Sequence, residues 1–351
     1  MSDIAAIDAN FKVETKIAQE DLRFYDSRQA PFQICGVYFE DGKFRRMPES
    51  VAKDVNPGVL RLHANTAGGR IRFQTDSPYV AIHTKMPSIG KMPHFALTGS
   101  AGFDLYGKEE GEQERYMGTF TPPFAITDGY ESILRFPGAK MREITIHMPL
   151  YSEVSALYIG LQEGAIILPP KPYKAQKPIV YYGSSITQGG CASRPGNAYQ
   201  NPIARRLNVD YVNLGFSGSA QGEQVIADYI AGLPMSVFVY DYDHNAPTPE
   251  HLQETHEKMF LTIRKAHPDI PVVMMSRPRA YLSTEDQRRL EIITATYENA
   301  KARGDQNVYL LTGPELMRDA GSDGNVDGTH PTDYGFASMA RALGDLLEKL
   351  Q

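Results

Sequence analysis

Hydrophobic and polar residues follow two different patterns in the two halves of the chain. Between residues 32 and 161 they alternate with a period near two, most clearly at 70–74 and 142–148. This alternation places one face of a strand on a core and the other in water, as in an antiparallel sheet. Further strand-like runs between turn residues occupy 32–39, 58–63, 80–85, 95–98 and 155–161. This half therefore predicts a β-sandwich, preceded by a weakly patterned extension of about 25 residues that packs across the other domain.

Beyond residue 178, strands and helices alternate instead. Short apolar runs predict buried strands at 178–182, 210–214, 235–241, 270–276 and 307–311. Amphipathic stretches between them predict helices at 197–207, 223–231, 249–266, 284–303 and 332–350. Repeated strand–helix–strand units are typical of a parallel sheet, because parallel neighbours need a crossover connection. The predicted fold class is therefore α/β, a parallel sheet with helices on both faces, preceded by an all-β domain of sandwich or jelly-roll type.

A proline-rich segment separates the two halves. Residues 168–178 contain four prolines, at positions 169, 170, 172 and 178. Proline fixes φ and lacks an N–H donor, so this segment is expected to be a stiff extended linker. The predicted organisation is a sandwich domain with its extension at 1–167, a linker at 168–178 and an α/β domain at 179–351.

Composition excludes several classes of protein. With 351 residues, 22% of them charged and 42% hydrophobic, the chain is neither disordered nor fibrous. Its formal charge of −6 disfavours nucleic acid or a membrane as partner, and we expect the patch of Lys43, Arg45 and Arg46 to be a solvated face. No apolar run approaches the ~18 residues of a membrane span, and residues 1–16 show no signal-peptide core, so we expect a cytoplasmic protein. Cys35 and Cys191 are expected to be free thiols.

Four polar segments follow strands of the α/β half, at 182–190, 213–218, 241–245 and 327–331. Because the carboxyl ends of parallel strands gather at one edge of a sheet, these segments are expected to meet there. The first holds Ser184 and Ser185 in a tight turn that exposes a serine hydroxyl, although both serines would also serve as helix caps. The last places Asp327 three residues before His330, where a carboxylate orients an imidazole; an Asp-Gly turn alone would give the same spacing.

In their order along the chain, these segments resemble the conserved blocks of the SGNH (GDSL-type) hydrolases, a superfamily of serine esterases and acylhydrolases. The resemblance covers the chain from about residue 178 onward and implies an SGNH-type α/β domain. It implies Ser185 as nucleophile, His330 as base and Asp327 as the residue that orients His330. It also implies an oxyanion hole formed by the N–H groups of Ser185 and Gly218 and the side-chain amide of Asn245.

Two positions depart from the family pattern. Ser184 stands where the family usually has an aspartate before the nucleophile. The third block, usually Gly-x-Asn-Asp, has the sequence Asp243-His244-Asn245-Ala246 and keeps only the asparagine. Because a nucleophilic serine does not need the preceding aspartate, its loss indicates a subfamily rather than an inactive protein.

The N-terminal half adds a second resemblance. Gly102-Phe103-Asp104-Leu105-Tyr106 is similar to the G-x-D-L-Y signature of a β-sandwich domain that precedes a subset of SGNH hydrolases. Residues 189–196 are typical of the same subset. Members of this subset are carbohydrate esterases or have no assigned substrate.

Together the resemblances imply a carboxylic ester hydrolase that removes short acyl groups, above all acetyl, from an oligosaccharide or another small-molecule ester. They imply neither a metal nor a cofactor, and no apolar segment resembles a lid for long acyl chains. The absence of Trp weakens the carbohydrate assignment, although 20 Tyr and 15 Phe offer rings for stacking. Two alternatives remain: a lipid acylhydrolase or thioesterase with the same triad, and a non-catalytic glycan-binding protein.

Several further residues are candidates for binding. His244 and Arg194 are candidate substrate contacts, with an ordinary loop salt bridge as the alternative for Arg194. Cys191 is expected to be a structural thiol, because no separate base is paired with it. Asp241 and Asp243 lie near His244, but a metal site would need further ligands at defined spacing. The sequence leaves the oligomeric state open, although a homo-oligomer could form through flat sandwich faces.

Overall fold

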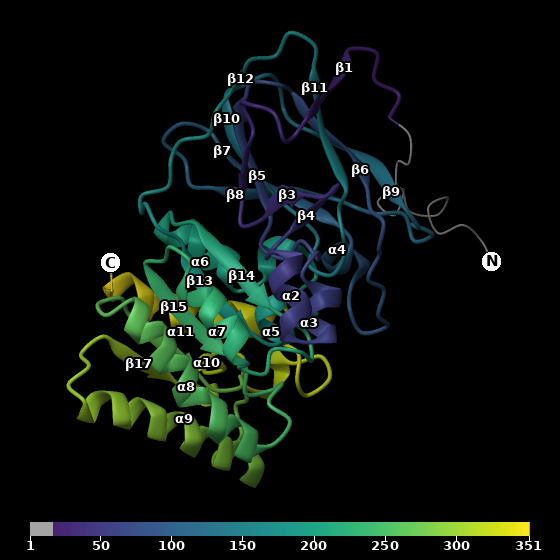
Figure 1. Ribbon diagram of the computed structural model, residues 1–351. Coiled ribbons are helices and arrows are strands. Elements are labelled where there is room, and N and C mark those ends of the chain that lie inside the picture. Colours follow the sequence, from purple (N-terminus) through teal and green to yellow (C-terminus); the bar gives the residue numbers. More distant parts are fainter. Residues whose placement is uncertain (1–16, 351) are drawn as a thin grey trace.

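The computed structural model describes residues 17–350 and places the antiparallel half of the chain beside the parallel half (Figure 1). Residues 1–16 of the predicted extension lie outside the described residues. Its end forms β1 (Leu22–Asp26), which pairs antiparallel with β11 (Ala156–Gln162) within the same half, so packing across the other domain is wrong for this part. Between residues 17 and 350, the helices include none whose length and apolar character would suit a membrane span.

Two antiparallel sheets form the N-terminal half. The first has the strand order β1-β11-β6-β9, with β6 at Tyr79–Lys85 and β9 at Gly129–Arg135. In the second, β2 lies beside β5 and the main order is β12-β5-β10-β7-β8. Its strands are β2 (Gln33–Cys35), β5 (Arg70–Thr75), β7 (Phe103–Lys108), β8 (Arg115–Phe120), β10 (Arg142–His147) and β12 (Ile167–Leu168). Phe73 of β5 and Ile82 of β6 are buried in one shared core, which confirms the predicted sandwich.

The segment 58–63, predicted as a strand, is helical instead. It lies in α3 (Pro57–Leu62), which follows α2 (Glu49–Val55). The side-chain oxygen of Asn56 accepts the N–H of Val59 at 2.9 Å, and Pro57 occupies the first helical position, where no N–H is needed. Val59 is buried in a core shared with strands of the C-terminal half, so a long-range contact favours the helix over a strand.

Two other predicted strands are corrected. The segment 95–98 enters the short helix α4 (Leu97–Ser100), and 32–39 is divided between β2 and β3 (Tyr38–Glu40), which pairs with β4 (Lys43–Arg45) in a separate sheet. Gly36 lies between β2 and β3 with a φ of 72°. A Cβ atom there would stand 2.2 Å from the carbonyl oxygen of Gly68, so only glycine permits this turn.

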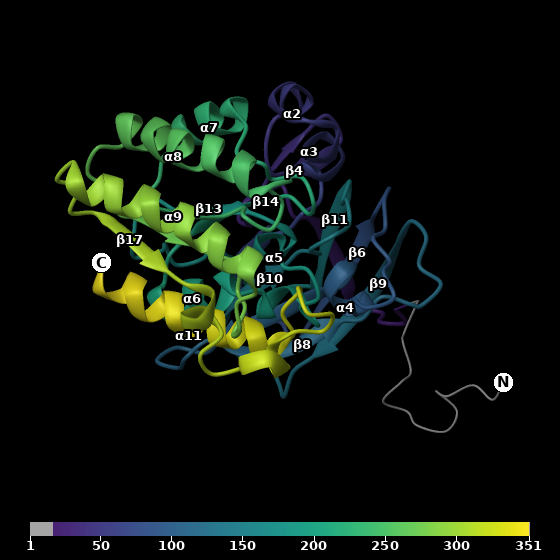
Figure 2. The same ribbon diagram turned by 90° about the horizontal axis from the view of Figure 1, so that it is seen from below.

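A five-stranded parallel sheet of order β14-β13-β15-β16-β17 forms the centre of the C-terminal half. The strands are β13 (Ile179–Gly183), β14 (Tyr211–Gly215), β15 (Val237–Asp241), β16 (Val272–Met275) and β17 (Val308–Leu311). Helices α6 and α11 pack on one face, and α7, α8 and α9 pack on the other (Figure 2). This arrangement confirms the predicted α/β fold class. The helices are α5 (Ser185–Gln188), α6 (Gln200–Leu207), α7 (Gln224–Ala231), α8 (Pro249–Ala266), α9 (Thr284–Ala302), α10 (Gly313–Leu316) and α11 (Asp333–Lys349), with 3₁₀ turns η2 (Pro195–Asn197) and η3 (Gly321–Gly324).

The two halves meet along the β14 side of this sheet. Arg70 of β5 donates a hydrogen bond of 2.5 Å to Asp210, and its guanidinium lies 3.8 Å from the ring centroid of Tyr211. Residues 169–178 contain neither helix nor strand. Arg72 holds this segment by a hydrogen bond of 3.0 Å to the carbonyl of Lys171. The second sheet of the sandwich thus adjoins the strand whose carboxyl end carries the second polar segment.

Candidate active site

Ser184 and Ser185, the two candidate serines, have different positions in the turn after β13. Ser184 is the N-cap of α5, and its Oγ accepts the N–H of Ile186 at 3.2 Å. Ser185, 7% exposed, occupies the first position of that helix. Gly183 ends the strand, and a Cβ atom there would stand 1.9 Å from Oδ1 of Asp241. The capping interpretation therefore holds for Ser184, which leaves the Ser185 hydroxyl available for other contacts.

Ser185, His330 and Asp327 form one continuous hydrogen-bonded chain. Oγ of Ser185 lies 2.9 Å from Nε2 of His330, and Nδ1 of His330 lies 2.7 Å from Oδ2 of Asp327. The other oxygen of Asp327 accepts the N–H groups of Thr329 and His330 at 3.0 and 2.8 Å. Asp327 thus both stabilises the Asp-Gly turn and orients the His330 ring, so the two alternatives for this spacing hold together. The structure brings together the three side chains that the sequence analysis predicted as catalytic.

Hydrogen bonding keeps the carboxyl group of Asp327 ionised. Burial on its own would raise its pKa, but the hydrogen bonds from His330 and Thr329 lower the pKa of Asp327 to about 2. A carboxylate at Nδ1 requires that nitrogen to carry the proton of the neutral ring. Nε2 then has the free lone pair, facing the serine hydroxyl.

Two of the three expected oxyanion groups, those of Gly218 and Asn245, lie on neighbouring loops, and the third is the N–H of Ser185 at the start of α5. Gly218 has a φ of 68°, which favours glycine, and a Cβ atom there would meet nothing within 4 Å. Among residues 17–350, no hydrogen bond occupies its N–H group. The Asn245 amide donates one hydrogen bond of 2.9 Å to the carbonyl of Phe216, and its second N–H is available for another acceptor. Oε1 of Gln188 accepts the N–H of Ser217 at 3.0 Å, which ties this loop to the end of α5.

Arg46 from the N-terminal half supports the end of β14 from behind. It is 2% exposed and donates hydrogen bonds to the carbonyls of Gly215 at 2.5 Å and Leu62 at 2.7 Å. Its guanidinium lies 4.7 Å from the ring centroid of Phe216. Burial lowers the pKa of Arg46 to about 9. The expectation of a solvated face is wrong here and at Arg45, which is also 2% exposed, because both side chains point into the protein.

Asp241 lies buried under the nucleophile turn, a role that sequence reasoning missed. Its Oδ1 accepts the Thr187 hydroxyl at 2.5 Å and the Ser184 N–H at 3.4 Å, whereas Oδ2 has no hydrogen-bond partner within residues 17–350. Burial raises the pKa of Asp241 to about 8. Asp243 instead forms an ion pair of 3.4 Å with Arg277, so the two carboxyl groups serve different contacts. The position of Asp241 at the end of β15 was a signal that it adjoins the site.

The two candidate substrate contacts have different surroundings. His244 is half-buried, and its Nε2 has no hydrogen-bond partner among the residues that the structure describes. Burial, together with the positive charges of Arg277 and Arg279, lowers the pKa of His244 well below its ordinary value, so the ring is neutral. Arg194 donates to Oδ2 of Asp104 at 2.9 Å and to the hydroxyl of Tyr106 at 2.7 Å. These contacts connect the two halves, and substrate binding by either residue stays a prediction.

Family models match both halves of the chain. The C-terminal half matches the GDSL-like Lipase/Acylhydrolase family over residues 176–348. The N-terminal half matches the GxDLY model, the N-terminus of Esterase_SGNH_hydro-type, over residues 22–167. The protein belongs to the GDSL-like lipase/acylhydrolases. It is an ester hydrolase with an N-terminal GxDLY domain, as the sequence motifs predicted.

Solved structures share this two-part architecture. A protein assigned as a GDSL-like lipase from Bacteroides ovatus ATCC 8483 is 28% identical, with a TM-score of 0.83 over 94% of this chain and 98% of that one. The salicylyl-acyltransferase SsfX3 from a tetracycline biosynthetic pathway is 20% identical, with a TM-score of 0.73 over 95% and 98%. An acetyl xylan esterase (Est2A) from the rumen bacterium Butyrivibrio proteoclasticus is 12% identical, with a TM-score of 0.58 over 93% and 98%. A search of curated proteins finds no match.

Two side chains of the N-terminal half reach the hydrogen-bonded chain of Ser185, His330 and Asp327 in this GDSL-like hydrolase. The Tyr151 hydroxyl donates to the carbonyl oxygen of Ser185 at 3.2 Å. Nε2 of His94 lies 3.9 Å from Oδ2 of Asp327, and the rings of His94 and His330 are 5.7 Å apart between centroids. No motif surrounds either residue in the sequence, so only the tertiary structure places them here.

Cys191 lies beside His330, after α5. Its backbone has a φ of 74°, and its side chain is half-buried. Burial raises the pKa of the Cys191 thiol to about 12. A thiol that stays protonated at neutral pH is a poor nucleophile, in keeping with the expectation that Cys191 is not catalytic.

Proposed function

We propose that this protein is a serine esterase that hydrolyses short acyl esters, with an acetylated carbohydrate as its substrate. The observation that carries the proposal is the unbroken chain of hydrogen bonds from Ser185 through His330 to Asp327, at 2.9 and 2.7 Å. Such an arrangement matches the requirements of nucleophilic acyl transfer, which are a hydroxyl, an adjacent base and a group that orients the base.

In the first half of the reaction, Oγ of Ser185 attacks the ester carbonyl while Nε2 of His330 accepts the hydroxyl proton. The carbonyl oxygen becomes negative and accepts hydrogen bonds from the N–H groups of Ser185 and Gly218 and from the Asn245 amide. The bond to the alcohol then breaks, and His330 returns its proton to the leaving oxygen. The carboxylate of Asp327 stabilises the imidazolium that exists between these steps.

In the second half, water attacks the acyl-enzyme by the same route. His330 accepts a proton from the water, and the same three donors stabilise the second oxyanion. The acid leaves when the bond to Oγ breaks, and the proton on His330 returns to Ser185. The products are one carboxylic acid and one alcohol, and the enzyme is unchanged.

Polar groups around the triad support a short acyl group on a polar alcohol. Three polar groups line this region. The Tyr151 hydroxyl bonds the carbonyl of Ser185, the His94 ring lies beside Asp327, and the Asn245 amide bonds the carbonyl of Phe216. A long hydrocarbon chain gains free energy only from apolar surface, and these polar groups offer little of it. The architecture shared with an acetyl xylan esterase adds support for acetyl on a carbohydrate.

The first test is hydrolysis of p-nitrophenyl acetate, butyrate and octanoate by the wild type and the Ser185→Ala variant. We expect acetate to be the best of the three, and loss of the nucleophile to lower kcat by about 10⁴-fold or more. The control is Ser236→Ala, because Ser236 lies before β15 at the opposite end of the sheet and donates its hydrogen bonds to the carbonyl of Pro178. Equal rates for the wild type and Ser185→Ala would contradict the proposal.

Chain-length preference and natural substrates distinguish the alternatives. Activity that rises towards octanoate would favour a lipid acylhydrolase. Acetate release from acetylated oligosaccharides would support the carbohydrate assignment. Oligosaccharide binding without acetate release would favour a glycan-binding protein. A cytoplasmic location remains part of the proposal, and fractionation of the source cells tests it.

A further inference from the structure

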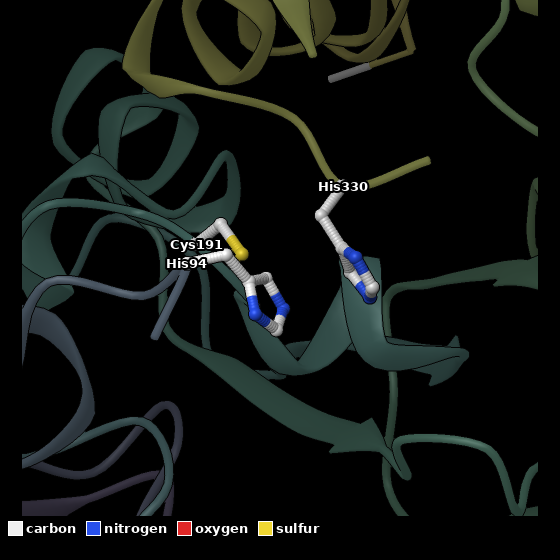
Figure 3. A group of neighbouring side chains, drawn as sticks. All are labelled: His94, Cys191 and His330. Atoms are coloured by element: carbon white, nitrogen blue, oxygen red, sulfur yellow. The ribbon is translucent and has the colours of Figure 1, made fainter. Parts of the chain in front are cut away.

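Three side chains with metal-binding atoms lie close together, and one of them is the triad histidine. His94 comes from the loop between β6 and α4, Cys191 follows α5, and His330 precedes α11. One ligand atom from each lies within 4.8 Å of the others, and residues 17–350 contain no further group of three such side chains. Figure 3 shows the Cys191 sulfur and the His94 ring next to each other, with the His330 ring opposite.

This set has the composition of a zinc site. Imidazole and thiolate ligands suit Zn²⁺, and a set of three protein ligands leaves the fourth tetrahedral position open. The Cys191 thiol is protonated without metal, so its S–H bond breaks as the zinc–sulfur bond forms, and the proton is released to solvent. Zinc bonds of about 2.0–2.3 Å in a tetrahedron separate ligand atoms by roughly 3.4–3.6 Å. The side chains would therefore need to close by little more than about 1 Å. His94 is 38% exposed on a loop, so rotation of its side chain can supply that movement.

We propose that His94, Cys191 and His330 bind Zn²⁺ and that the bound ion switches the esterase off. Both ring nitrogens of His330 are used in the hydrogen-bonded chain, Nε2 with Ser185 and Nδ1 with Asp327. A metal on Nε2 occupies the lone pair that accepts the serine proton. A metal on Nδ1 displaces the carboxylate that orients the ring. Either bond removes the base from the reaction.

The site joins the two halves of the molecule. His94 belongs to the sandwich half, whereas Cys191 and His330 belong to the α/β half. His330 alone offers a single ligand atom, so His94 and Cys191 are the residues that make this a metal site. Only the inhibitory part of the inference rests on the proposed esterase activity, since metal binding requires no catalysis.

Binding is tested first, on the Ser185→Ala variant, which keeps all three ligands and cannot turn over ester. We expect calorimetric titration with ZnCl₂ to give one site per chain. Because loss even of outer-shell partners weakens metal sites by about 10–100-fold, His94→Ala and Cys191→Ala should each weaken binding at least about tenfold. Co²⁺ in place of Zn²⁺ should give a thiolate-to-metal absorption band that Cys191→Ala abolishes.

Matched controls are available for both ligands. His83 has the same side-chain exposure as His94, 38%, but lies on β6 and pairs with Glu131. Cys35 is the other free cysteine and is buried in β2. His83→Ala and Cys35→Ala should bind zinc as tightly as the parent. Binding that is equally tight in the His94→Ala and Cys191→Ala variants, or a missing cobalt–thiolate band, would overturn the site.

Inhibition is tested on enzyme with an intact Ser185. Saturating Zn²⁺ should abolish p-nitrophenyl acetate hydrolysis reversibly, with recovery after addition of EDTA. Each ligand variant is compared with its own zinc-free rate, and we expect the inhibitory zinc concentration to rise at least about tenfold. Zinc that binds to Ser185→Ala but leaves the wild-type rate unchanged would overturn the switch and leave the esterase assignment intact. An inactive wild type would contradict the proposed function, while the binding result on Ser185→Ala would stand.

Discussion

At the scale of single residues, Asp241 shows how a buried group can set the properties of the nucleophile turn. Its carboxyl group lies between the end of β13 and the start of α5. Thr187 and Ser184 donate hydrogen bonds to one of its oxygens, and the other has no hydrogen-bond partner in the described part of the chain. A charged carboxylate with so few donors would be costly in this position. The raised pKa, about 8, means that the group is neutral at neutral pH.

Asp241 therefore predicts a pH dependence of stability. Its folded pKa is about 8, above the ordinary value of 3.8, so the folded state binds more protons between these limits. The stabilising contribution is complete below about pH 4 and is lost as the pH rises through about 8. Asp241→Asn cannot ionise, so its free energy of unfolding should rise relative to the wild type between pH 5 and pH 9. Urea unfolding at both pH values measures this, and an unchanged difference would contradict the prediction.

At the scale of elements, the end of β14 is held by a residue from outside its own domain. Arg46 follows β4 and donates hydrogen bonds to carbonyls of Gly215 and Leu62, which joins the sheet of one half to α3 of the other. The loop that carries Gly218 begins directly after this point. We therefore expect the position of Gly218, the proposed oxyanion donor, to depend on a side chain about 170 positions earlier in the chain.

Arg46→Met should lower both stability and activity. Loss of the donor to the Gly215 carbonyl costs about 1–3 kcal/mol, whereas the Leu62 carbonyl still accepts the N–H of Asn65 at 3.0 Å. The loop with Gly218 also loses its support. The neighbour Arg45 is a matched control with the same exposure of 2%, but it bonds Glu49 at 2.6 Å within the N-terminal half. The Arg45→Met variant should have a lower free energy of unfolding than the wild type, but its kcat per folded molecule should be unchanged. Urea unfolding and p-nitrophenyl acetate kinetics measure the two effects, and an equal loss of kcat in both variants would argue against positioning by Arg46.

At the scale of the whole molecule, Asp104 of the G-x-D-L-Y segment joins the two halves. It is fully buried on β7, and its Oδ1 lies 2.7 Å from Nδ1 of His147. The other oxygen accepts hydrogen bonds from Arg194 at 2.9 Å and from the N–H of Gly196 at 2.8 Å. The signature motifs of the two domains therefore contact each other, and the site lies beside their contact.

Loss of the Asp104 carboxylate should destabilise the whole molecule. Breaking a buried ion pair from one side typically costs about 3–5 kcal/mol, because the remaining charge stays buried without its partner. We expect a cost of this size for Asp104→Ala in urea unfolding. Asp26→Ala removes a carboxylate that pairs with Arg28 at the surface and should cost at most about 1 kcal/mol. Similar costs for the two variants would show that Asp104 does not stabilise the contact between the halves.

Local sequence was sufficient to predict most elements of the C-terminal half. The helix at 249–266 has its predicted bounds, and the five predicted strands pair in one parallel sheet. Apolar runs and helix caps act over a few residues, so such elements leave a clear local pattern. The segment at 58–63 was missed because its helix is stabilised by packing on a core formed mainly by the other half.

The sequence by itself determined the order of strands and helices in the C-terminal half, the four polar segments at strand ends and the local Asp327–His330 turn, because each depends on neighbours in the chain. Tertiary structure alone decided what lies around them. It placed Arg46 behind β14, Asp241 under the nucleophile turn, and His94 beside His330. Burial and charge at such positions arise from contacts between residues distant in sequence, and no local pattern encodes those contacts.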